Sequence, residues 1–105
     1  MNPSTTLDFM KSCAESRAAC INCAEHENAE GCANQCRTNA VLAECTQHLI
    51  ALNAPQATEV AQLAIDSAKK CDEKCSQHQN SHCQACSKAA KNLAEVLAQY
   101  QHQAK

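Results

Sequence analysis

Apolar and cysteine positions recur every three or four residues along most of the chain, which is the spacing of an amphipathic α-helix. The stretch from Ser4 to about Glu27 contains no helix breaker and is predicted to be a first helix. One side of that helix carries Phe9, Met10, Cys13, Cys20, Cys23 and Ala24. The pattern then loosens over His26 to Gly31, and a second helical segment continues to about Leu52.

The second half of the chain repeats this arrangement after a break at Asn53-Ala54-Pro55. Pro55 suits the first turn of a third helix, which ends in the polar run from Gln77 to Ser81. One face of the third helix is predicted to carry Val60, Leu63, Ala64, Ser67, Cys71, Cys75 and His78. Ser81 can cap a fourth helix, whose predicted inner face holds Cys83, Cys86, Ala90, Leu93, Leu97 and Tyr100.

Four helices joined by short loops predict an all-α fold, an antiparallel up-down-up-down four-helix bundle with a cysteine-lined core. We expect residues 1–105 to form a single domain, because the length suits one modest core. The composition agrees: helix-forming residues dominate, and the breakers are Gly31, Pro3 and Pro55.

The two halves are loosely mirror-related in their cysteines. The first reads Cys20-x2-Cys23-x8-Cys32-x3-Cys36 and the second reads Cys71-x3-Cys75-x7-Cys83-x2-Cys86. These eight residues lie where one helix ends and the next begins, so an antiparallel bundle gathers them at one end. The opposite end is predicted to be an ordinary aliphatic core of Leu7, Phe9, Leu49, Ile50, Leu52, Val60, Leu63, Leu93, Val96 and Leu97.

The second helix does not fit this picture without adjustment. Cys36 and Cys45 are nine residues apart, which places them on opposite sides of a straight helix. Cys45 shares a face with Val41, Leu42, Leu49 and Leu52. The helix is therefore expected to kink, to start late, or to hold Cys32 and Cys36 off the main seam.

Charge and hydropathy exclude several classes of protein. The net charge is −2 and the aromatic residues are Phe9 and Tyr100, so there is no basic, aromatic surface for nucleic acid. The longest apolar runs are four residues, Ala40–Ala43 and Leu49–Leu52, whereas a membrane span needs about 20. The N-terminus does not resemble a secretory signal, so a cytoplasmic location is predicted, with an exported mature form as the alternative.

Ten cysteines in 105 residues direct attention to sulfur chemistry. Thiols can fill a core, form disulfides, catalyse redox reactions through Cys20-x2-Cys23 or Cys83-x2-Cys86, or bind metal. Zinc in four-thiolate sites would use eight cysteines for two ions and leave each site at −2. About one Cu(I) per thiolate would neutralise the whole set, because this soft ion is shared between soft sulfur ligands. Charge balance therefore favours Cu(I), and we expect a protein that is not an enzyme.

The passage from Cys71 to Cys86 resembles the helix 3 to helix 4 signature of the bacterial four-helix-bundle copper storage proteins. The first half of the chain, with Cys13, Cys20, Cys23 and the Asn53-Ala54-Pro55 joint, is similar in layout. The resemblance implies storage of several Cu(I) ions per chain in the bundle core, often by a homo-oligomer, with a copper chaperone as a further partner. The candidate ligands are Cys13, Cys20, Cys23, Cys32, Cys36, Cys45, Cys71, Cys75, Cys83 and Cys86.

Three histidines, His26, His78 and His82, cluster near the cysteine-bearing end and are candidates for transient capture of Cu(I) as it enters. They could equally be polar residues of solvated turns. His48 and His102 fall at the other end, where surface positions are expected. The alternative to copper storage is a disulfide-stabilised helical bundle that acts as a protein-interaction module.

Overall fold

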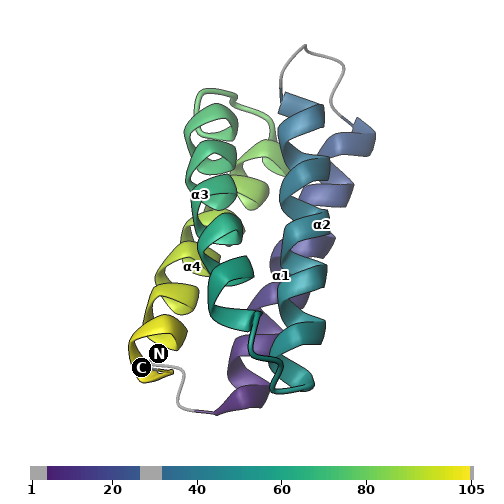
Figure 1. Ribbon diagram of the computed structural model, residues 1–105. Helices are drawn as coiled ribbons and strands as arrows, with labels where there is room; N and C mark the ends of the chain where they lie inside the picture. The colour runs from purple at the N-terminus through teal and green to yellow at the C-terminus, as the bar shows by residue number, and fades with distance from the viewer. Residues whose placement is uncertain (1–4, 27–31, 105) are drawn as a thin grey trace.

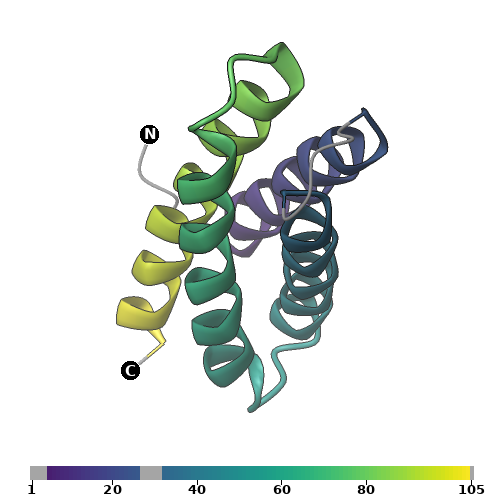
Figure 2. The same ribbon diagram turned by 90° about the horizontal axis from the view of Figure 1, so that it is seen from above.

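The computed structural model describes residues 5–26 and 32–104, and these form four α-helices in an antiparallel bundle (Figure 1). The helices are α1 (Thr6–His26), α2 (Cys32–Ala51), α3 (Ala57–Cys75) and α4 (Ser81–Gln103). Each helix packs against two neighbours, α1 against α2 and α4, and α3 against α2 and α4. The predicted all-α four-helix bundle is confirmed, and Figure 2 shows its two hairpins side by side.

The buried residues of each helix follow alternating steps of three and four, the spacing that keeps a stripe facing one side. On α1 the stripe runs through Phe9, Cys13, Ser16, Cys20 and Cys23. On α3 it runs through Ala57, Ala61, Ala64, Ala68, Cys71 and Cys75, and on α4 through Cys83, Cys86, Ala90, Leu93 and Leu97. Much of the core is therefore made of small side chains, which let the helices approach closely.

The α2–α3 connection stops the helix through backbone geometry. Asn53 has a positive φ of 51°, which an Asn tolerates better than most residues. Its N–H donates to the Ile50 carbonyl at 3.0 Å, and the Ala54 N–H donates to the Leu49 carbonyl at 2.9 Å. This pair of bonds is the Schellman arrangement, so the predicted stop at residues 53–55 is confirmed.

Other predicted helix boundaries differ by one or two residues in the structure or lie outside the described residues. Pro55 lies in the turn before α3 and not in its first turn, and Ser81 is the first residue of α4, with Asn80 at the cap position. The predicted turn at residues 28–31, and the predicted helix ends at Ser4 and Glu27, lie outside the described residues.

The inner face of α2 carries Cys32 and Cys36 and not Cys45. The buried stripe of α2 is Cys32, Cys36, Asn39, Ala40, Ala43, Thr46 and Ile50. Cys45 is exposed, and Val41 and Leu52 are 67% and 75% exposed. The prediction of an inner face through Val41, Cys45 and Leu52 is therefore wrong. The expectations that the helix starts late or holds Cys32 and Cys36 off the main seam are also wrong.

The aliphatic end is smaller than predicted. Phe9, Ile50, Leu93, Val96 and Leu97 are buried as expected. Three other expected core residues face solvent, namely Leu7, Leu52 and Leu63. Alanines occupy the interior positions that these larger side chains were expected to fill. Within the described residues, none of the helices is both long and apolar enough to cross a lipid bilayer.

Candidate metal centre

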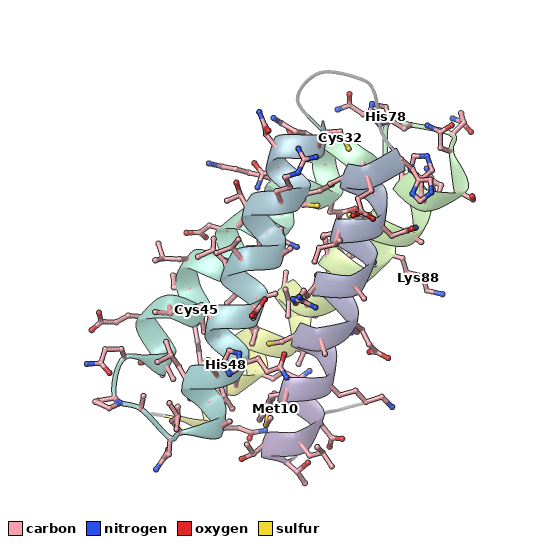
Figure 3. The ribbon with its side chains drawn as sticks, turned by 90° about the vertical axis from the view of Figure 1, so that its right-hand side faces the viewer. Met10, Cys32, Cys45, His48, His78 and Lys88 are labelled. Carbon is pink, nitrogen blue, oxygen red and sulfur yellow. The ribbon has the colours of Figure 1, made fainter. Side chains whose placement is uncertain are left out.

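Eight thiols, two from each helix, converge at the end of the bundle where α1 and α3 end and α2 and α4 begin. Every one is at most 2% exposed. This set, here called the thiol cluster, is Cys20, Cys23, Cys32, Cys36, Cys71, Cys75, Cys83 and Cys86. Figure 3 shows Cys32 and His78 close to this end, with Met10 near the other. The predicted gathering of eight cysteines at one end is therefore what the structure shows.

The sulfur atoms of the thiol cluster form a continuous network of contacts. Cys36 Sγ lies at its middle, 3.8 Å from Cys32, 3.9 Å from Cys71, 3.5 Å from Cys75 and 3.6 Å from Cys86. The other separations range from 3.2 Å, between Cys32 and Cys75, to 3.9 Å, between Cys23 and Cys32. All ten cysteines of the chain are free thiols. Distances of this size place several thiols around one small space without joining any of them covalently.

Two groups of four thiols are compact enough to surround a metal ion. In each group all four sulfur atoms lie within 4.8 Å of one another. The outer group is Cys23, Cys32, Cys36 and Cys75, and the inner group is Cys36, Cys71, Cys75 and Cys86. The two groups share Cys36 and Cys75.

Histidines line the outer end of the thiol cluster, which we call the mouth. The Nδ1 atoms of His78 and His82 lie 3.4 and 3.5 Å from Cys83 Sγ, and both rings are half-buried. His26 is exposed, with its Nδ1 2.8 Å from the Asn22 carbonyl oxygen and its ring centroid 5.7 Å from that of His82. The three histidines therefore lie together, as the sequence predicts. Two mixed sets, Cys23/His82/Cys83 and Cys32/His78/Cys83, could also hold an ion.

The remaining candidate ligands lie apart from the thiol cluster. Cys13 is buried on α1 seven residues before Cys20, and seven residues span about 10 Å along a helix. Cys45 is exposed on the outer side of α2. His48, whose side chain is 69% exposed, lies 3.8 Å from Glu44, and His102 is also exposed, as expected for both. Met10 is partly buried against the core, in agreement with its predicted place.

Burial and sulfur contacts shift the thiol acidities in opposite directions. Burial raises the pKa of Cys13 to about 12, and burial also raises the pKa of Cys32 to about 12. Hydrogen bonding with Cys36 lowers the pKa of Cys20 and of Cys75, whereas hydrogen bonding with Cys20 raises the pKa of Cys36. Burial disfavours ionisation of the thiols as a set, so a bound cation is needed before all of them can ionise.

A buried asparagine, which is not among the residues predicted for the site, closes the inner side of the cluster. Asn39 is 0% exposed, and its Nδ2 donates to Cys20 Sγ at 3.1 Å and to Ser16 Oγ at 3.2 Å. Its Oδ1 is buried with no hydrogen-bond partner among the described residues. The signal was present: Cys32, Cys36, Asn39 and Ala43 follow steps of four, three and four. A polar residue on that stripe marks the border between the thiol cluster and the rest of the core.

Comparison with known proteins agrees with this geometry. A model of the copper storage protein family matches residues 3–102. The uncharacterized cysteine-rich protein YhjQ of Bacillus subtilis (strain 168) is 28% identical over 89 residues, which cover 85% of this chain and 82% of that protein. The solved structure of the Cu(I)-bound copper storage protein BsCsp3 matches with a TM-score of 0.84 and 25% identity, over 90% of this chain and 95% of that one. The chain belongs to the copper storage protein family.

Proposed function

We propose that this protein binds and stores several Cu(I) ions through thiolates that point into the core of the bundle. The observation that carries the proposal is the contact network of eight buried thiols, with sulfur separations of 3.2 to 3.9 Å. Cu(I) suits such a site because it is soft and can be held by thiolates that are shared between ions. The name of the similar structure, a Cu(I)-bound copper storage protein, supports the same metal.

The charge balance supports many ions and not one. Each thiol that binds Cu(I) gives up its proton to solvent, so an ion with one positive charge replaces a proton with one positive charge. At one Cu(I) per thiolate the filled cluster therefore carries no net charge, whereas a single Cu(I) held by two thiolates would displace two protons and leave −1. The eight cluster thiols supply the main capacity. Cys13 and Cys45 complete the proposed ligand set, Cys13 as a separate buried thiol and Cys45 as a surface one.

Anaerobic titration of the reduced protein with Cu(I), against a competing chelator, tests the proposal. Several tightly bound ions per chain are expected, approaching the number of cluster thiols. Saturation at one or two ions would contradict storage. Counting free thiols in the purified protein tests the alternative, a disulfide-stabilised interaction module, which requires most cysteines to be oxidised.

We infer that ions enter at the mouth, past His26, His78 and His82. The half-buried rings of His78 and His82 lie between solvent and Cys83. Imidazole nitrogen holds Cu(I) less tightly than thiolate, which suits a residue that passes the ion inward.

The role, location and assembly of the protein are proposed from its sequence and its family resemblance, and not from a contact in the structure. We propose a non-enzymatic role, a cytoplasmic location, a single domain over residues 1–105, a copper chaperone as donor or acceptor, and assembly into a homo-oligomer. Light scattering on the purified chain, with and without copper, measures the oligomeric state. A monomer under both conditions would contradict that part of the proposal.

A further inference from the structure

The sulfur positions of the metal-free cluster also suit a different cation. The S···S edge of a tetrahedral zinc thiolate site is about 3.8 Å, because the Zn–S bond is about 2.3 Å long. In the outer group, Cys32 Sγ lies 3.9, 3.8 and 3.2 Å from the sulfurs of Cys23, Cys36 and Cys75. In the inner group, Cys36 Sγ lies 3.9, 3.5 and 3.6 Å from the sulfurs of Cys71, Cys75 and Cys86. Small movements would bring each group to the zinc geometry.

Both groups are three-dimensional and not flat. Three sulfurs of each group form a triangle with sides of 3.2 to 3.9 Å. A fourth sulfur in the same plane, 3.9 Å (outer group) or 3.5 Å (inner group) from one corner, would either overlap another sulfur or lie more than 4.8 Å from one. All four atoms of each group instead lie within 4.8 Å of one another. The arrangement therefore approaches a tetrahedron, and tetrahedral sets of four thiolates are typical of zinc.

The two groups also have a specific relation to each other. They share Cys36 and Cys75, whose sulfurs are 3.5 Å apart, so together they contain six thiols and not eight. Two tetrahedra that share two corners share an edge. We propose that, in the absence of copper, these six thiols hold two Zn²⁺ ions in edge-sharing tetrahedral sites, with the thiolates of Cys36 and Cys75 bridging the ions.

The charge balance favours the shared arrangement over separate sites. Two Zn²⁺ ions displace six protons from six thiols, and the resulting cluster carries −2, or −1 per ion. Two isolated four-thiolate sites would carry −2 per ion and would need eight thiols. Sharing therefore halves the buried charge per ion, which matters in a core where charge is costly. This activity is separate from copper storage, although it uses the same thiols. Because Cu(I) is the softer ion, it displaces the zinc as it enters.

Titration of the reduced, metal-free chain with Zn²⁺ against a chromophoric chelator measures the stoichiometry. Two tightly bound ions per chain are expected. Co²⁺ reports the geometry, and intense visible bands of a tetrahedral thiolate complex are expected at two equivalents. One tight ion, or none, would overturn the proposal, as would a Co²⁺ spectrum of octahedral type.

Serine variants test the shared edge. Cys71→Ser leaves the outer group whole and Cys23→Ser leaves the inner group whole, so each should keep one tight ion. Cys36→Ser removes a ligand from both groups, so both ions should bind at least about tenfold more weakly, because losing even a residue that only supports a ligand costs about 10- to 100-fold in metal affinity. His48→Ala, at a side chain that is 69% exposed and lies apart from the thiol cluster, is the control and should keep two. A tight ion retained by Cys36→Ser would overturn the bridge.

Three further measurements separate zinc binding in the thiol cluster from binding at the mouth and from copper storage. The double variant His78→Ala/His82→Ala should still bind two Zn²⁺, and a loss there would place the zinc at the mouth and overturn the proposal. Adding Cu(I) to the zinc-loaded chain should release both ions. Cu(I) titration of each variant, with circular dichroism as a check on folding, shows whether storage survives when zinc binding fails, so the two proposals can fail independently.

Discussion

The two ends of this bundle use the same helical stripe for different purposes. At the mouth end the stripe positions are cysteines, whose sulfurs touch across all four helices. At the far end the same stripes carry Leu93, Leu97, Ile50 and Phe9. The ring of Phe9 packs edge-on against Tyr100 with centroids 5.3 Å apart, a favourable arrangement for aromatic pairs. The buried side chains of Phe9, Ile50, Leu93 and Leu97 offer Cu(I) no ligand, and the described residues of the thiol end bury few large apolar groups. Stability and metal capacity are therefore expected to respond to different mutations.

The largest expected effect is on stability and comes from the aliphatic end. Leu97 is 0% exposed. Leu97→Ala should therefore lower the free energy of unfolding of the metal-free protein by about 2 to 5 kcal/mol. Urea denaturation followed by circular dichroism measures this. The control is Leu63→Ala, at a side chain that is 57% exposed. That variant should change stability by no more than about 0.5 kcal/mol. Equal losses in both variants would mean that burial of Leu97 is not what stabilises the aliphatic end.

A substitution in the thiol end should show the opposite behaviour. Cys75 Sγ lies 3.2 Å from Cys32 Sγ and 3.5 Å from Cys36 Sγ. Cys75→Ser should therefore lower Cu(I) capacity by about one ion, as charge balance suggests. The helical signal should not change. Cys45→Ser, at the exposed thiol, should have a smaller effect on capacity than Cys75→Ser. If both variants lose the same number of ions, burial in the cluster is not what sets capacity.

Cys13 lies between the thiol cluster and the aliphatic end. Its pKa is raised by burial, which indicates an apolar environment like that of the aliphatic end. This pKa is about 12 instead of the ordinary 9.0, so the folded protein prefers the neutral thiol. That preference contributes fully below pH 9 and is lost as pH rises from 9 towards 12. The metal-free protein should therefore lose about 2 kcal/mol from this group between about pH 8 and about pH 10.5. Urea denaturation at the two pH values, for the native chain and for Cys13→Ser, measures this.

Comparing the native chain with Cys13→Ser isolates the contribution of Cys13 to the loss of stability at high pH. Other buried thiols, Cys32 among them, contribute to that loss in the same direction, but they are present in both proteins. The variant should show a smaller loss of stability at high pH. An unchanged pH dependence would mean that Cys13 ionises without cost and is not held in an apolar part of the core.

The sequence predicts most of the architecture because helix periodicity and chain breaks are local properties. The cysteine spacing around Cys71, Cys75, Cys83 and Cys86 is enough to place thiols at one end of an antiparallel bundle. Prediction from the sequence fails where both large and small apolar side chains could occupy the inner face of a helix. The size of Leu63 and Val41 suggests a hydrophobic stripe, yet the buried positions belong to alanines that permit close helix packing.

The site is harder to predict in its details, because they depend on contacts between helices. The spacing from Cys32 to Ala43 places Asn39 on the buried stripe, but it does not indicate that the Asn39 amide reaches Cys20 on another helix. The error at Cys45 has the same origin, since counting apolar neighbours selected the wrong side of α2. The pairing of Cys36 with sulfurs from three other residues on α3 and α4 likewise requires the rotation of each helix about its axis.

The smallest expected effect is on the rate of Cu(I) uptake and not on the number of ions bound. It distinguishes the mouth from the aliphatic end. His26, His78 and His82 lie at the mouth, and two of them contact Cys83 through Nδ1. Replacing all three with alanine should slow Cu(I) uptake, or its removal by a chelator, several-fold, because an incoming ion loses its intermediate ligands. The final capacity should change little, since the buried thiols remain. Stopped-flow measurement of the thiolate-to-copper absorption follows the rate.

The matched control is the double variant His48→Ala/His102→Ala, which removes two exposed imidazoles away from the mouth. If loading requires passage between the helices at the thiol end, this variant should load at the native rate. Ions arriving from the far end would have to pass Leu93 and Leu97, both 0% exposed, and then the layer of Ser16 and Asn39 before reaching Cys20. If His48 and His102 controlled the rate of loading, the assignment of the two ends would be reversed. The closed apolar layer would then be the route of entry, and the histidines of the mouth would have no role in loading.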